Sequence, residues 1–289
     1  MFPKDIEDPP VRRAGRAVRS MEQVTQSRLT NVLHPEPSGE ARRVRSPAKV
    51  KVLLTSVCRP MGPAQGDAPS VGYEVLHRQI TRAQGIFSPR STNFTFALDY
   101  IAENLDAPTV VLHYPSHREL IRELRKGPAF VGISFLLATF HRMKEVVALV
   151  RKFAPAARIV LGGYGTVLDD QTLAPYADFI CREEGVSFFR ALLGEPARPM
   201  PYDHPLVTTT LRVFSVPVDR TGIIFAGLGC PHGCDFCCTS HFFGRHHVRL
   251  LPTGDDVFRV IERYLEIDPK MNLAILDEDF LVARDWVAT

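Results

Sequence analysis

The chain has 289 residues, 45% of them hydrophobic, and a formal net charge of +3. This length predicts two domains, and the hydrophobic share is sufficient for ordinary cores. No uninterrupted apolar stretch reaches membrane-spanning length, and no secretory signal is visible, so we expect no membrane span. Six cysteines, three of them clustered, are typical of a reducing compartment and indicate a cytoplasmic protein rather than a disulfide scaffold.

The positive charge is concentrated at the N-terminus. The first 51 residues hold 11 of the 35 basic residues and only 6 of the 32 acidic ones. Residues 34–48 mix Pro, Ser, Glu and Arg with little to bury, which predicts a basic disordered leader over 1–48. A nucleic-acid-binding arm is the alternative. Nothing in the folded body indicates a nucleic-acid surface.

The next part of the chain alternates short apolar runs with helical patterns. A loop rich in glycine and proline is expected at 58–72. Strands are predicted at 51–55, 109–113, 130–135, 158–161 and 178–181, and helices at 119–126, 141–153 and 186–193. This alternation predicts an α/β domain over 49–197, with a doubly wound parallel sheet covered on both faces. Ligands of such sheets bind outside the carboxyl ends of the strands.

A second unit follows a proline-rich stretch. We assign residues 198–220 to an interdomain linker and 221–289 to the second unit. A strand is predicted at 223–226 and another at 273–276. Between them a helix follows Thr253, where Thr253 and Asp256 form a weak capping-box pattern.

The most informative motif lies just after the strand at 223–226. Cys230, Cys234 and Cys237 have the spacing Cys-x3-Cys-x2-Cys. Three thiolates can bind three irons of a four-iron cluster and leave the fourth iron open to a small molecule. A zinc site completed by Cys238 or His232 is one alternative, and a group of buried thiols without a metal is another. Cys238 itself is interpreted as a packing or incidental residue.

The residues around these cysteines identify a family. Residues 229–238 read Gly-Cys-Pro-His-Gly-Cys-Asp-Phe-Cys-Cys, followed by Thr-Ser and, at 242–245, Phe-Phe-Gly-Arg. The segment resembles radical S-adenosylmethionine (SAM) enzymes, in the branch that carries an N-terminal cobalamin-binding domain. The resemblance implies a 4Fe–4S cluster on the three cysteines, with SAM on the open iron, where an electron cleaves it to methionine and a 5′-deoxyadenosyl radical. An electron donor such as flavodoxin or ferredoxin is implied too.

The resemblance also assigns roles outside the cysteines. It implies a partial (β/α) barrel, and a whole eight-unit barrel takes about 250 residues, so 221–289 is expected to be its first part only. Phe236 would lie near the SAM adenine, although core packing is equally compatible with the sequence. Asp277, at the end of the last predicted strand, would help to hold the methionine amino group, and a solvated acidic turn is the alternative.

Cobalamin is the third cofactor that the resemblance implies. The resemblance to the family's cobalamin-binding domain covers roughly residues 50–195 and is looser than the resemblance at the cysteines. The family's Asp-x-His-x-x-Gly motif is absent, so no histidine from that motif is expected on the cobalt, and His113 and His117 are interpreted as surface or cap residues. The predicted cobalamin contacts are Ser134, Gly162, Gly163, Tyr164 and Glu184.

The function expected on this basis is radical methylation or rearrangement of an unknown small-molecule or lipid-like substrate. Catalytic residues are not predicted. Two alternatives remain from the sequence: a catalytically inactive truncated remnant or cobalamin-binding module, and a zinc-binding module.

Overall fold

The computed structural model describes residues 51–59, 90–91, 95–213 and 216–280. The leader expected at 1–48 and most of the loop expected at 58–72 lie outside these ranges.

The first unit is built on a five-stranded sheet in which every neighbouring pair is parallel. Its order is β3-β1-β4-β5-β6, which is 2-1-3-4-5 in order of occurrence, a common doubly wound order. All five predicted strands are present, so the predicted α/β fold with a doubly wound parallel sheet is confirmed. The strands are β1 (Val52–Ser56), β3 (Thr109–Leu112), β4 (Phe130–Ser134), β5 (Arg158–Gly162) and β6 (Phe179–Ile180).

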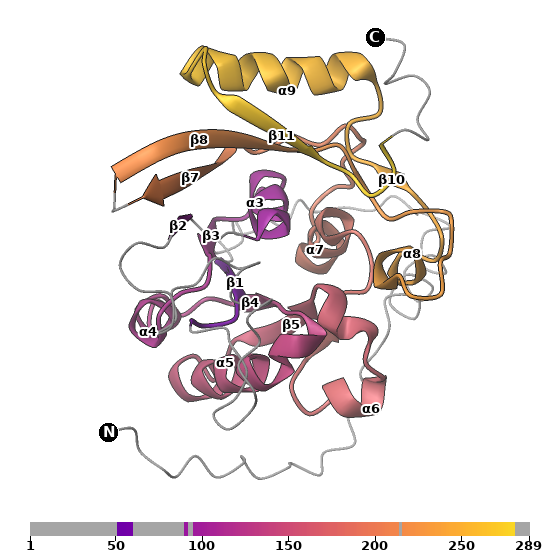
Figure 1. Ribbon diagram of the computed structural model, residues 1–289. Helices are drawn as coiled ribbons and strands as arrows, with labels where there is room; N and C mark the ends of the chain where they lie inside the picture. Colours follow the sequence, from indigo (N-terminus) through magenta and orange to yellow (C-terminus); the bar gives the residue numbers. More distant parts are fainter. Residues whose placement is uncertain (1–50, 60–89, 92–94, 214–215, 281–289) are drawn as a thin grey trace, which may run out of the picture.

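Helices cover both faces of this sheet (Figure 1). Alternate strand residues point to opposite sides, so Leu53 packs towards the core shared with α4 and α5, whereas Leu54 packs towards α3 and α7. No helix in the described ranges is both long and apolar enough to span a bilayer. The helices are α3 (Phe96–Glu103), α4 (His117–Leu124), α5 (Phe140–Phe153), α6 (Asp170–Leu173) and α7 (Gly185–Leu193), with 3₁₀ turns η1 (Leu137–Thr139) and η2 (Tyr164–Val167).

The second unit contains a βαβ element. Strands β8 (Val216–Phe225) and β11 (Asn272–Leu276) are parallel, and α9 (Gly254–Ile267) connects them and covers the outer face of their sheet (Figure 1). Thr253 caps α9 through the expected capping box with Asp256. The cysteine segment lies between β9 (Gly227–Leu228) and β10 (Val248–Arg249), a short antiparallel pair, and contains α8 (Cys238–Phe242).

The segment 198–220 is not only a connection. It contains β7 (Val207–Val213) and the first part of β8, which pair antiparallel, and β2 (Arg90–Ser91) pairs with β7. The linker was predicted from the prolines of this segment, although the β-branched residues at 207–210 favour a strand. The second sheet, β11-β8-β7-β2, therefore begins in the segment that the sequence analysis assigned to a linker.

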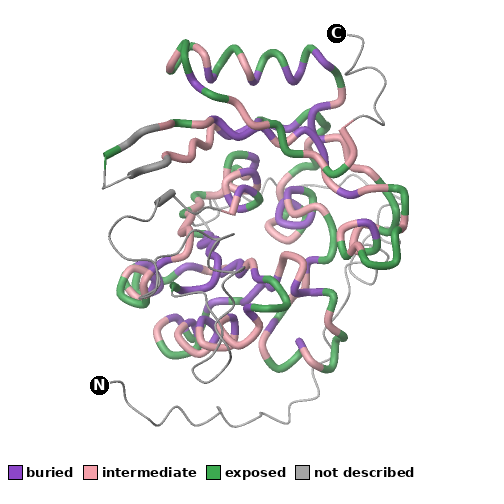
Figure 2. The backbone as a smooth tube through the Cα atoms, in the orientation of Figure 1, coloured by how far each residue is buried: buried purple, intermediate pink, exposed green. Residues whose placement is uncertain are grey.

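The two sheets share one layer of helices. Helices α3 and α7 lie between them (Figure 1), and buried residues run along this helix layer and both sheets (Figure 2). The contact is aromatic: Phe96 of α3 stacks on Phe225 of β8 with ring centroids 4.1 Å apart, and Tyr100 and Tyr202 pack beside them. His204 is 2% exposed in this cluster, and its Nε2 accepts a hydrogen bond from the Phe225 backbone amide at 3.0 Å.

Stability at acidic pH is expected to depend on His204. Burial lowers the pKa of His204 from 6.5 to about 4, so between these values the unfolded chain binds the proton and the folded protein does not. The contribution is complete above about pH 6.5 and is lost as the pH falls towards 4, by about 3 kcal/mol at most. Urea unfolding at pH 7.5 and pH 5 measures it. His204→Gln keeps an acceptor for the Phe225 amide but cannot titrate, so its stability should change less between the two pH values; an equal change would contradict the prediction.

Candidate functional site

The carboxyl edge of the first sheet presents hydroxyl groups where the strand order reverses. β1 and β4 are neighbours there, and Ser56 and Ser134 end them as register partners. In a sheet of this order the crevice outside these two strands is the expected ligand site. Ser56 is buried and its Oγ accepts a hydrogen bond from the Tyr114 amide at 2.6 Å, whereas Ser134 is half-buried. Ser56 was not among the predicted residues, although a hydroxyl ending a buried strand is a readable signal.

Two glycines continue this edge after β5. Gly163 has φ +83°, and a Cβ there would lie 2.8 Å from the Phe135 carbonyl oxygen and 2.9 Å from Ser134 Oγ. Only glycine fits this position without strain. Gly162 is different, because its added Cβ would meet nothing closer than Cys181 Cβ at 4.0 Å. The space above Gly162 lets a ligand approach the backbone.

Two other residues that were considered as cobalamin contacts, Glu184 and His113, instead accept hydrogen bonds from backbone amides. Glu184 caps α7, where its carboxylate accepts from the amides of Val186 and Ser187 at 2.5 and 3.0 Å. His113 binds the Thr95 amide through Nδ1 and lies 3.0 Å from the Asp99 carboxylate through Nε2. Glu184 therefore positions the helix beside the edge, and His113 has the cap-like role that the sequence analysis favoured.

The cysteine loop lies at the surface of the second unit. Cys234 is exposed and Cys230 and Cys237 are half-buried, so the alternative of a buried thiol group is wrong. The Cys237 amide donates to the Cys234 carbonyl at 2.9 Å, which closes the turn between them. Phe236 within this turn is 93% exposed, which excludes a core-packing role. Three accessible thiols on one short loop are a donor set that suits an iron–sulfur cluster.

Two cysteines elsewhere provide a contrast. Cys58 and Cys181 are buried in the first unit, and burial raises the pKa of each thiol to about 12. Thiols of this kind are inert packing residues. The chemistry therefore concentrates in the loop at 230–237.

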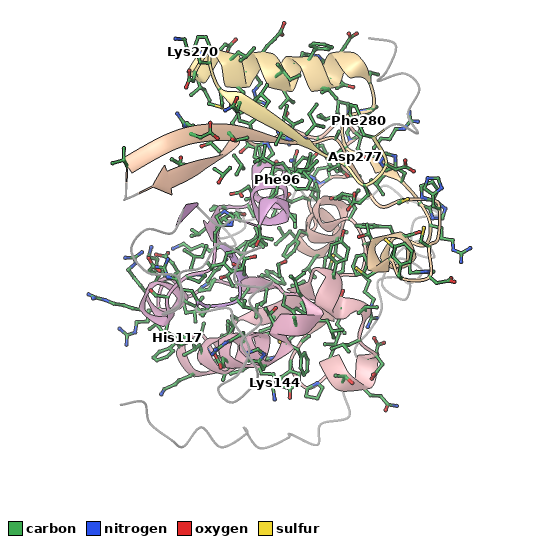
Figure 3. The ribbon with its side chains drawn as sticks, in the orientation of Figure 1. Phe96, His117, Lys144, Lys270, Asp277 and Phe280 are labelled. Atoms are coloured by element: carbon green, nitrogen blue, oxygen red, sulfur yellow. The ribbon has the colours of Figure 1, made fainter. Side chains whose placement is uncertain are left out.

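The acidic turn after β11 faces this loop (Figure 3). Asp277 has a fully buried side chain 3.2 Å from Nε2 of His247. Asp279 lies 2.9 Å from Nε2 of His232, and Cys230 Sγ donates to it at 3.7 Å. The alternative of a merely solvated turn is wrong for both aspartates. From the sequence, His232 is a candidate metal ligand, but its contact with Asp279 and the contact of Asp277 with His247 were not predicted, because the partners come from distant segments.

Tyr164 joins the two candidate sites. It follows the glycine pair of the first unit, yet its ring packs edge-on against Phe242 and Phe243 of the cysteine segment, with centroids 5.3 and 6.4 Å away. Its hydroxyl donates to Glu278 at 3.2 Å, and burial raises the pKa of Tyr164 to about 12, so it remains a donor. The carboxyl edge of the first sheet is therefore in direct contact with the segment that follows the cysteine loop and with the acidic turn after β11.

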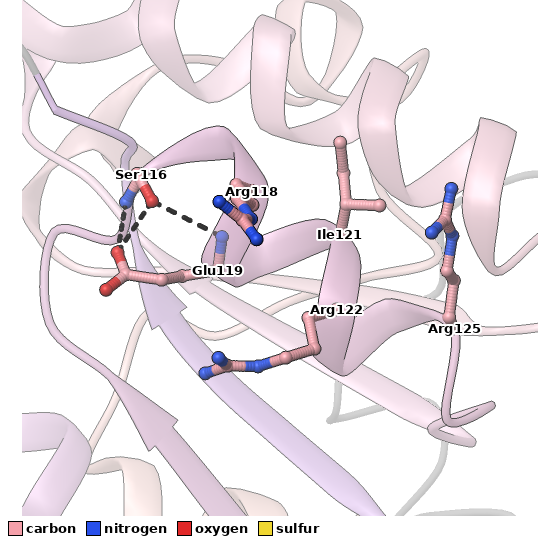
Figure 4. Close-up of a pocket in the computed structure, with 6 residues that line it drawn as sticks. All are labelled: Ser116, Arg118, Glu119, Ile121, Arg122 and Arg125. Carbon is pink, nitrogen blue, oxygen red and sulfur yellow. Dashed lines mark hydrogen bonds between the residues drawn. The ribbon is translucent and has the colours of Figure 1, made fainter.

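A separate hollow of about 790 Å³ runs along the outer face of α4 (Figure 4). None of the predicted cofactor residues lines it, and two of its three arginines have neighbours of their own: Arg122 pairs with Glu123, and Arg125 lies over the Phe153 ring. We assign the hollow to the solvated surface of the helix. Its lining comprises Ser116, Arg118, Glu119, Ile121, Arg122 and Arg125.

Comparison with known families agrees with the first unit. Residues 63–193 match the family model of the B12 binding domain. No curated protein matches the chain. The matched range includes every residue predicted to contact cobalamin, and with the parallel sheet it supports cobalamin as the ligand of this unit. The residues at the carboxyl edge fit such a ligand through the open backbone at Gly162 and the hydroxyl of Ser134.

Proposed function

We propose that this protein is a cobalamin-dependent radical SAM protein, in which a 4Fe–4S cluster and SAM at the cysteine loop act beside cobalamin at the carboxyl edge of the first sheet. The observation that carries the proposal is the contact of Tyr164, in the unit that matches the B12 binding domain, with Phe242 just after the cysteine loop and with Glu278 in the acidic turn. Two cofactor sites that must exchange groups need this proximity.

Cys230, Cys234 and Cys237 are the proposed cluster ligands. A four-iron cluster with one open iron supplies the electron that cleaves bound SAM. We propose that Phe236, whose side chain is exposed to solvent, covers the SAM adenine. Asp277 is the proposed partner of the methionine amino group, and to take this role its carboxylate must exchange His247 for the ligand.

The first unit contributes binding and position. We propose that Ser134, Gly162, Gly163 and Tyr164 contact cobalamin, and that Glu184 acts indirectly by fixing the start of α7. The outcome is methylation of an unactivated carbon or a radical rearrangement, on a small-molecule or lipid-like substrate. A flavodoxin or ferredoxin is the proposed electron donor. Accessible thiols of this kind stay reduced in the cytoplasm, the compartment we expect.

The central experiment is anaerobic reconstitution with iron and sulfide, followed by SAM and a reductant. We expect bound iron and sulfide in equal amounts and the release of 5′-deoxyadenosine. A protein that carries its cluster but forms none of this product would contradict the proposal. Cobalamin binding is measured separately by the absorbance of the corrin that co-elutes with the protein.

Cobalamin binding is expected to depend on the open backbone at Gly162. Gly162→Val adds methyl groups where the protein itself leaves space, so the fold should persist while the ligand is obstructed. An overlap of this kind costs about 1–3 kcal/mol, which weakens hydroxocobalamin binding by a factor of about 5 to 150. Val110→Ala, at an exposed position on β3, is the control. Unchanged affinity in Gly162→Val, with an unchanged melting temperature, would place the ligand elsewhere.

A further inference from the structure

We infer that Cys230, His232 and Asp279 form a mononuclear site for a zinc-like divalent metal, distinct from the three-cysteine set because it uses only one of those thiols. One donor atom from each of the three residues lies within 4.8 Å of the other two. A thiolate, an imidazole and a carboxylate are the three side-chain donors that zinc accepts in proteins.

The donor spacing is close to that of a tetrahedral zinc. With metal–ligand bonds of about 2.0–2.3 Å, two ligand atoms on one zinc lie about 3.4–3.6 Å apart. Cys230 Sγ lies 3.7 Å from the Asp279 carboxylate, and His232 Nε2 lies 2.9 Å from it. Small movements of the side chains would admit the ion between them.

The site is held in place by hydrogen bonds behind it. Ser240 Oγ donates to the Cys230 carbonyl at 2.7 Å and accepts from the Gly233 amide at 2.9 Å, which fixes the loop on both sides of His232. The Asp279 amide donates to the buried Asp277 carboxylate at 2.7 Å. Supporting bonds of this kind orient metal ligands.

The solvent exposure of the site also favours metal binding. The Asp279 side chain is 13% exposed, which desolvates its charge, whereas the His232 side chain is 61% exposed and opens the site to solvent. Three protein ligands and a solvent-facing fourth position are typical of zinc sites that bind water or a small ligand. Because Cys230 belongs to both sets, this metal and the proposed cluster exclude each other.

The test is titration of the reduced, cluster-free full chain with Co²⁺, followed by competition with Zn²⁺. We expect one bound metal with a thiolate–cobalt absorption band, abolished in Cys230→Ala. His232→Ala and Asp279→Asn should each weaken zinc binding about tenfold or more. His241→Ala and Asp235→Asn, which alter nearby residues outside the site, should bind as the unaltered chain does.

Cys234→Ala separates this site from the cysteine trio. It should retain zinc binding while it loses the ability to assemble a four-iron cluster. If Cys234→Ala abolishes zinc binding as Cys230→Ala does, or if His232→Ala and Asp279→Asn bind normally, the inference is wrong. These results are independent of whether reconstitution yields active protein, so a failure here is distinguishable from a failure of the radical SAM proposal.

One consequence can be measured by iron content. One equivalent of Zn²⁺ added before reconstitution should reduce the iron incorporated by the unaltered chain. In His232→Ala and Asp279→Asn the same zinc should have a smaller effect, because the competing site is weakened. If zinc reduces iron incorporation equally in all three proteins, zinc at this site does not compete with the cluster.

Discussion

Cys237→Ser is expected to reduce the iron that the protein holds after anaerobic reconstitution from about four atoms per chain to less than one. The physical reason is that a cluster held by only three thiolates has no spare protein ligand. The turn between Cys234 and Cys237 brings their backbones together by a 2.9 Å hydrogen bond, so the two thiols belong to one short loop. Iron and sulfide assays and the low-temperature electron paramagnetic resonance of the reduced protein measure the effect.

The adjacent cysteine is the matched control. Cys238 is exposed and begins α8, whereas Cys237 is the residue before the helix. Cys238→Ser should therefore retain iron at the level of the unaltered chain. Loss of iron in Cys238→Ser as complete as in Cys237→Ser would indicate four sulfur ligands and a closed site, and the proposed SAM position would then have no open metal.

Arg190→Met is expected to lower the free energy of unfolding by about 3–5 kcal/mol, because the largely buried Glu195 carboxylate loses its charged partner and two backbone carbonyls lose their donor. Arg190 is 6% exposed, and its guanidinium donates to the carbonyls of Pro196 and Asn104 at 2.6 and 2.7 Å. It also pairs with Asp106 at 2.9 Å and with Glu195 at 3.1 Å. The side chain thus ties α7 to the segment that follows α3.

An exposed pair shows whether burial is the cause. Arg59 and Glu119 form an ion pair with side chains 56% and 41% exposed. Arg59→Met should cost no more than about 1 kcal/mol, because water screens such pairs. Urea unfolding of both variants at pH 7.5 gives the comparison. Equal losses in Arg190→Met and Arg59→Met would show that the buried network contributes no more than a surface pair.

The elements of the first unit could be predicted because each strand is apolar on both faces. Leu53 and Leu54 of β1, for example, point to opposite faces and are both buried, as a parallel sheet under two helical layers requires. Strand β7 was missed for a related reason. It lies in a proline-rich segment, so its β-branched run was not taken as a strand, and its antiparallel pairing with β8 is visible only in the structure.

The candidate sites likewise combine local motifs, which the sequence shows, with contacts between distant residues, which it does not. The spacing of the cysteines and the glycine pair is local, and it was readable along the chain. The contacts of Tyr164 with Phe242 and Glu278, and of Asp279 with Cys230, join residues from 49 to 114 positions apart. No periodicity connects such residues, because their approach depends on how the two sheets pack around α3 and α7.

By itself, the sequence determined the parallel α/β unit, the expected cofactor donors and the places where a ligand could approach the backbone. Only the tertiary structure decided that Glu184 caps a helix, that Asp277 is buried against His247, and that His232 and Asp279 converge on Cys230. The reason is physical: hydrophobic periodicity and ligand spacing are encoded between near neighbours, whereas the partners of polar side chains are set by the packing of distant segments.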